Sequence, residues 1–245
     1  HEGRLWWFGG TQLFGSVSDD YENFNAGTVG DSGPINRTLA TGPVDRINFA
    51  VSLLRLFIGT AGEEVAMRST SLDEPLTPSN MAAKVTSTEG TANLRAVKID
   101  DRAVFVQRAL KRVFMLAYDV NTNDYRPQEL TLLVPDLLSG IASIAVQRQP
   151  DTRIHFVMDD GTVAIATYEA QEQVLCWSMF KTTAASGLVE KVMVLPGTSE
   201  DKVYYHVKRT INSATKRYLE RQATEAESVG ASVSWMMDCG LVVSQ

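Results

Sequence analysis

The chain has 245 residues, which fits one large domain or two small ones. Its hydrophobic content of 44% suffices for a sizeable core, and 21% charged residues exclude gross disorder. A net charge of −6 argues against a protein that grips nucleic acid by its phosphates, although it does not argue against a passage through which DNA slides. The sequence has neither a long apolar run nor a signal-peptide pattern. It begins at His1, and we expect both ends to continue in a longer chain.

Short strand patterns alternate with turn signals along the chain. The first hairpin is expected over residues 5–8 and 12–17, with its turn at Gly9-Gly10. Residues 19–41 and 70–91 are interpreted as long surface loops, and residues 128–138 are the one segment expected to be helical in part. The other expected strands are residues 47–51, 53–58, 65–68, 96–99, 103–107, 113–118, 141–147, 190–195, 202–208 and 216–222.

Residues 153–180 give the clearest pattern, three strands joined by two tight turns. Asp160-Gly161 suits a two-residue hairpin loop, whose central positions require a positive φ. Residues 170–173 form a polar turn, and the third strand is centred on Trp177, whose ring we expect between sheets.

Three-strand sets thus recur every 40 to 55 residues, the period of propeller blades. We therefore expect an all-β fold of β-propeller-like meander blades with long inserted loops. Residues 1–228 would form an incomplete propeller, and residues 229–245 would start a following domain or a closing strand.

The histidines and cysteines favour structural roles. His155 and His206 lie in expected strands without the spaced partners that catalysis or metal binding needs, and His1 stands at the start of the sequence. Cys176, beside Trp177, is expected to be a buried thiol. Cys176 and Cys239 form neither a disulfide framework nor a metal motif. No catalytic, cofactor-binding or metal residue is predicted.

The acidic pairs are also interpreted as structural. Asp159-Asp160 belongs to a hairpin turn, and Glu63-Glu64 follows a turn glycine. Residues 19–22 lack the ligand order of a calcium loop. A glycosidase would need two carboxylates roughly 5–10 Å apart across a cleft, and no sequence feature marks such a pair.

Two glycine-rich segments are interpreted as turns, because residues 9–11 and 59–62 lack the order of a phosphate-binding loop. The aromatic residues could instead stack sugars or bases. However, the adjacent Trp6 and Trp7 must point to opposite faces of a strand. One is expected in the core and the other against a neighbouring blade or subunit; Trp177 and Trp235 complete the set.

Ordered motifs resemble the tail nozzle (tail tubular B-like) proteins of short-tailed bacteriophages. They are RLWWFGGTQLFGSVSDDYENF (residues 4–24), IGTAGEE (58–64), KRVFMLAYD followed by Tyr125 (111–119), DGTVAIATYEAQEQVLCWS (160–178) and HVKRTINSATKRYLER (206–221). Phe156 stands where the family pattern has Trp, and the Pro-rich middle of the first motif is shortened.

The resemblance implies a structural virion protein of the tail, with no enzyme activity and no cofactor. Several copies, expected as a homohexamer, would form the distal channel that retains and then ejects the genome. The ring would contact the tail adaptor protein and tail fibres or spikes, and DNA would pass through without specific binding. The loops at residues 19–41 and 70–91 would make subunit contacts or gate the channel.

Two other classes stay open. One is a carbohydrate-binding or depolymerising phage propeller, which needs a cleft with exposed Trp and paired carboxylates. The other is a cellular propeller that acts as a binding scaffold.

Overall fold

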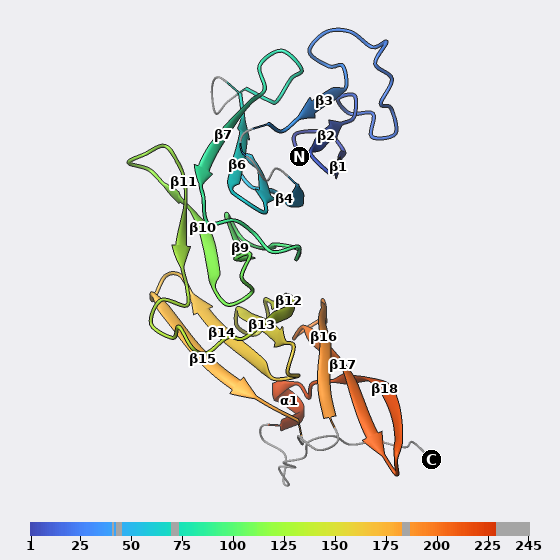
Figure 1. Cartoon of the computed structure of the whole chain (residues 1–245), viewed down its shortest axis with the longest axis vertical. Coiled ribbons are helices and arrows are strands. Elements are labelled where there is room, and N and C mark those ends of the chain that lie inside the picture. The colour runs from blue at the N-terminus through green and yellow to red at the C-terminus, as the bar shows by residue number, and fades with distance from the viewer. Residues whose placement is uncertain (41, 43–45, 70–73, 183–186, 229–245) are drawn as a thin grey trace. The chain divides into compact units, whose positions relative to one another are not determined.

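The structure is a computed structural model that describes residues 1–40, 42, 46–69, 74–182 and 187–228 (Figure 1). The expectation of an all-β chain is confirmed, with one short helix among these residues, α1 (Glu225–Ser228). The chain divides into two compact units, residues 1–133 and 134–245. Residues 229–245, which we expected to start a new domain and which include Trp235 and Cys239, lie outside the described residues.

The described part of the first unit holds three antiparallel sheets. In this part of the chain they are sheet A, with β1 (Trp6–Gly9), β2 (Gln12–Gly15) and β3 (Ile35–Thr38); sheet C, with β4 (Ile47–Ser52), β5 (Leu56–Thr60), β6 (Glu64–Arg68) and β7 (Ala82–Ser87); and sheet E, with β8 (Val97–Ile99), β9 (Arg102–Val106), β10 (Val113–Asp119) and β11 (Asp124–Glu129).

The second unit holds two more sheets in its described residues. They are sheet F, with β12 (Ile141–Gln147), β13 (Arg153–Met158), β14 (Val163–Glu169) and β15 (Val174–Phe180); and sheet G, with β16 (Gly187–Leu195), β17 (Lys202–Ile211) and β18 (Ala214–Arg221).

Every described sheet is a meander, in which consecutive strands are hydrogen-bonded neighbours. The first strands of the sheets begin about 40 to 50 residues apart, close to the interval expected from the sequence. Sheets C and E have four strands rather than the three expected, whereas sheet F has the four strands expected from residues 141–147 and 153–180. The two additional strands, β7 and β11, are edge strands of their sheets.

These edge strands were missed because their sequences carry weak strand signals. β7 lies inside the segment expected to be a loop, and it is largely exposed. β11 contains Pro127, which an edge strand tolerates because its outward N–H needs no partner. β3 likewise lies inside the other expected loop. The helix expected over residues 128–138 is absent: β11 runs to Glu129, and Leu133 is 91% exposed.

The turns correct one sequence prediction and support another. The β13–β14 connection is a four-residue turn over residues 159–162, in which Gly161 has a φ of 78° and the Asp160 carboxylate accepts the Thr162 N–H. Asp160 therefore caps the turn and does not adopt the expected positive φ. The two-residue turn with two positive φ values is Asn212-Ser213, between β17 and β18. The polar turn between β14 and β15 spans residues 170–173, as expected.

Sheet C is buried on both faces, because successive side chains of a strand point to opposite sides. Leu56 and Ile58 of β5 pack with Leu13 and Ile35 of sheet A. Phe57, between them, packs instead with aromatic residues of sheet E. The apolar faces of these three sheets therefore cover one another, and burial of this kind contributes about 25 cal/mol per Å² of apolar area.

Sheets F and G of the second unit are joined in the same way. Val157 and Val163 of sheet F pack against Val189, Val203 and Val207 of sheet G. Each inner side chain alternates with an outer one that sheet F does not cover, so β17 is buried at every second residue. Among the described residues of this unit, sheet G thus has one face covered by sheet F and one face that sheet F leaves uncovered.

Trp177 and Cys176 are less buried than expected. Both lie on β15, the edge strand of sheet F. Cys176 is exposed, and Trp177 is half-buried with its ring 5.6 Å from the ring of Phe156. The expectation of a buried thiol is therefore wrong, and the ring of Trp177 is only partly buried.

Replacement of the two aromatic partners should therefore have unequal effects. Phe156 is fully buried, so Phe156→Ala should lower the free energy of unfolding by about 3–5 kcal/mol. Trp177→Ala removes a half-buried ring and should cost about 1–2 kcal/mol. Urea denaturation of both variants measures this difference. A Trp177→Ala variant as unstable as Phe156→Ala would place this ring in an enclosed core.

Candidate functional site

The outer face of sheet A is aromatic and exposed. Trp6 packs against the core shared with sheet C, and its indole N–H donates to the His1 carbonyl at 3.1 Å. Trp7 points the other way and is 60% exposed. Phe14, its cross-strand partner, is half-buried. The prediction that Trp6 and Trp7 face opposite sides is confirmed, and Trp7 is the ring available to a partner.

A buried arginine holds the long loop beside this face. Arg4 donates through Nη1 to the Ser16 and Gly33 carbonyls, both at 2.6 Å, and through Nη2 to the Asp31 carbonyl at 2.7 Å. Desolvation lowers the pKa of the guanidinium. A buried charge is tolerated only when its hydrogen bonds are made, so these carbonyls fix the loop to β1.

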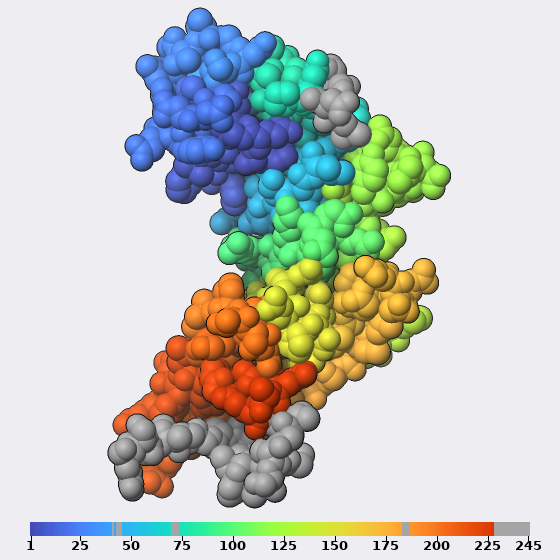
Figure 2. All heavy atoms as spheres, turned by 180° about the vertical axis from the view of Figure 1, so that it is seen from behind, coloured from blue at the N-terminus to red at the C-terminus, as the bar shows by residue number. Residues whose placement is uncertain are grey.

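The two loops that the sequence singled out meet in the structure. Arg37 donates to the Pro78 carbonyl at 2.7 Å, and Ser79 donates to the Asp31 carboxylate at 2.6 Å. In Figure 2 the blue atoms of the first loop lie against the teal atoms of the second. Between them is an apolar hollow of about 490 Å³, whose lining includes Phe14, Phe24, Val29, Pro34, Ile35 and Pro78.

This surface is acidic as well as apolar. Residues 5–36 contain no Lys or Arg, and their four acids are Asp19, Asp20, Glu22 and Asp31. We call the surface formed by Leu5, Trp7, Phe14 and residues 18–34 the loop face. Exposed apolar patches of this kind, rimmed by charge, are typical of protein–protein contacts.

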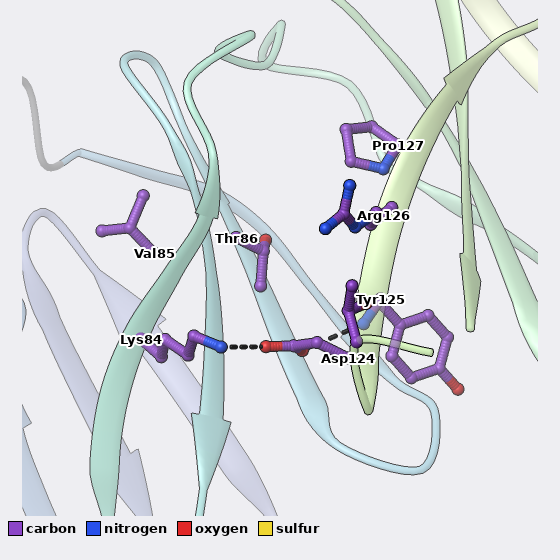
Figure 3. Close-up of a pocket in the computed structure, with 8 residues that line it drawn as sticks. Lys84, Val85, Thr86, Asp124, Tyr125, Arg126 and Pro127 are labelled. Carbon is purple, nitrogen blue, oxygen red and sulfur yellow. Dashed lines mark hydrogen bonds and ion pairs between the residues drawn. The ribbon is translucent and has the colours of Figure 1, made fainter. Parts of the chain in front are cut away.

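A second hollow, of about 430 Å³, lies between β7 and β11 (Figure 3). Lys84 and Thr86 face it from β7, and Arg126 faces it from β11. Its floor is the buried Asp124 carboxylate, which binds Lys84 at 2.6 Å and Arg55 at 3.2 Å. Arg126 is 3.4 Å from the carboxylate of Asp119. The charges are thus paired with one another, and the ion pairs hold sheet E to sheet C.

His155 has a structural place. The ring is fully buried, its Nε2 lies 3.3 Å from the Gln147 amide oxygen, and its Nδ1 lies 2.8 Å from the Tyr205 hydroxyl. Because the amide oxygen can only accept, Nε2 carries the hydrogen and Nδ1 accepts from Tyr205. Burial lowers the pKa of His155 to about 4, so the ring is neutral and links sheets F and G.

The other two histidines also contact protein groups. His206 lies 3.1 Å from the Glu190 carboxylate, and His1 lies 2.8 Å from the Ser52 hydroxyl. The three histidines are therefore not brought to one place. Among the residues that the structure describes, no group of three or more His, Cys, Asp or Glu residues could hold a metal ion.

Two buried carboxylates were not anticipated. Glu63 and Glu64 are both buried, and each leaves one carboxylate oxygen without a hydrogen-bond partner. Burial raises the pKa of Glu64 to about 7, opposed by hydrogen bonds from Ser87 and the backbone of Glu89 and Gly90. One acid directly before an apolar strand and one at its first position were the available signal. Both are inaccessible, so they do not form the carboxylate pair of a glycosidase cleft.

Comparison with known proteins adds no identity. No protein-family model matches the chain, and no curated protein matches it.

Among the residues that the structure describes, no helix is long and apolar enough to span a bilayer.

The two adjacent tryptophans give a matched test of this surface. Trp7→Ala should change the free energy of unfolding by less than about 0.5 kcal/mol, because the ring is largely in solvent. Trp6→Ala should cost about 2–3 kcal/mol, because it leaves a gap against the core. Urea denaturation of the two variants measures this difference. Equal losses of unfolding free energy would mean that Trp7 is packed.

Acid should weaken the sheet F–sheet G contact through His155. Its folded pKa of about 4 lies below its ordinary 6.5, so its contribution is complete above 6.5 and is lost as the pH falls toward 4. The full loss is about 3 kcal/mol. Unfolding measured at several pH values should show this component in the wild type and in His206→Gln, but not in His155→Gln. The same acid sensitivity in His155→Gln would assign it to another group.

Proposed function

We propose that this chain is a structural protein of a bacteriophage tail, a nozzle component built from propeller-type blades. The observation that carries the proposal is the series of consecutive antiparallel meanders packed face to face within each unit. Three of the meanders have the four strands of a propeller blade. The motifs that resemble the nozzle family lie on these strands and their turns.

Assembly is the activity that this geometry supports best. Three buried charged or polar residues, Arg4, Asp124 and His155, hold sheets and loops together. The exposed features are apolar surfaces, and sheet A presents the clearest one. A protein that works by contact with copies and partners needs such surfaces and needs no reactive cluster.

In the proposed assembly, several copies form a ring that continues the tail channel, with six copies as in the family it resembles. The ring binds the tail adaptor protein and tail fibres or spikes. A net charge of −6 suits a channel that repels phosphates, so that DNA passes without specific binding.

Imaging of the purified full chain tests the proposal. Multi-angle light scattering should give a multiple of the monomer mass, and electron microscopy should show rings with a central hole. Virions stained with an antibody against the chain should be labelled at the tail. A chain that stays monomeric in solution and is absent from the tail would contradict the proposal. Hydrolysis of a capsular polysaccharide by the monomer would favour a depolymerase.

A further inference from the structure

Sheet G has an outer face that combines apolar and basic side chains. Leu188, Met193 and Leu195 of β16 and Leu219 of β18 are exposed there. These side chains alternate with the buried ones that pack on sheet F. Leu219 stands opposite His206 in the strand register, which places both on the outer side. Four large aliphatic side chains are thus exposed on one face of this sheet.

The charges on this face are predominantly positive. Lys202 and Lys208 alternate with buried residues of β17, so they point outward. Arg217 pairs with Lys208 in the register and binds Glu190 at 2.8 Å, and Arg221 pairs with Tyr204. We call the outward side of β16–β18 the basic face. It presents more positive than negative side chains, whereas the loop face presents only acids.

We infer that the basic face of one copy binds the loop face of a second copy of this chain. Both faces carry exposed apolar side chains, and their charged side chains are of opposite sign. The contact therefore buries apolar area while it pairs Lys and Arg with Asp and Glu. Contacts between two identical faces would bring like charges together, which costs free energy. The inference rests on the proposed function and names the surfaces that would build its ring.

The aliphatic content argues for a protein occupant. Nucleic acid binds through phosphates and stacked bases, and neither uses exposed Leu and Met side chains. The loop face supplies what these side chains need, namely Trp7, Phe24 and an apolar hollow. Because two different faces meet, the contact is heterologous, and such contacts close into rings when the rotation between copies permits it.

Exchange of charges between the two faces tests the inference in the full chain. One variant carries Asp20→Lys and Glu22→Lys in the loop face, and the other carries Lys202→Glu and Lys208→Glu in the basic face. All four side chains point to solvent or lie partly exposed, so both variants should fold, which circular dichroism and the melting temperature verify. A matched control carries Asp136→Lys and Glu172→Lys, two exposed acids of other segments.

Each variant alone should lose association by about 100-fold, because the two introduced charges then repel like charges on the facing copy. An equimolar mixture of the two variants should recover the wild-type level, because the introduced lysines of one variant then face the introduced glutamates of the other. The control should associate as the wild type does. Sedimentation velocity measures the two variants, their mixture, the control and the wild type.

The other outcomes overturn the inference in distinguishable ways. If wild-type rings form and neither face variant weakens them, the inference is wrong and the proposed function stands. If the variants are weakened but their mixture does not recover, the two faces do not bind each other. If the basic-face variant assembles normally but loses binding to duplex DNA, the face belongs to nucleic acid. A monomeric wild type would contradict both the inference and the proposed function.

Discussion

The structure depends on one constraint: an antiparallel meander of three or four short strands has an apolar face that only another layer can cover. Leaving that face in water forfeits about 25 cal/mol per Å² of apolar area. Sheet C illustrates the solution, since its two faces are covered by sheets A and E, and β5 is buried at every residue. Sheets F and G likewise cover one apolar face of each other. The outer faces of sheets A and G carry exposed apolar side chains among charged ones.

Polar contacts give the stacked sheets their register. Apolar faces can slide past one another at little cost, but buried hydrogen bonds and ion pairs have one geometry. Asp124 joins Arg55 of sheet C to sheet E, and His155 joins sheet F to Tyr205 of sheet G. Arg4 does the same for the loop beside sheet A. Removal of one partner would leave a buried charge or donor unpaired, which costs more than the contact itself contributes.

The sequence predicted the parts of the fold that alternate strongly. The meander from β13 to β15, the opposite directions of Trp6 and Trp7, and the polar turn at residues 170–173 follow from a period of two and from turn chemistry. The edge strands β7 and β11 could not be predicted, because many of their side chains meet solvent and their sequences show little alternation of apolar and polar residues. The burial of Trp177 and Cys176 depended on which strand lies at the edge, and local sequence does not encode that.

The buried Glu64 and the carbonyl clamp of Arg4 arise from contacts between distant segments. The sequence likewise did not predict that the two loops contact each other, although each loop was identified as a candidate for subunit contacts.

Oxidative footprinting of two methionines tests most directly whether the uncovered faces are covered by assembly. Met193 on the basic face and Met179 on the edge strand β15 have similar exposure, 42% and 47%. Hydroxyl-radical labelling of separated monomer and assembled fractions, read by mass spectrometry, compares them within one chain. The account predicts that assembly protects Met193 and Trp7 and leaves Met179 labelled as in the monomer. Equal labelling of Met193 and Trp7 in both fractions would contradict it.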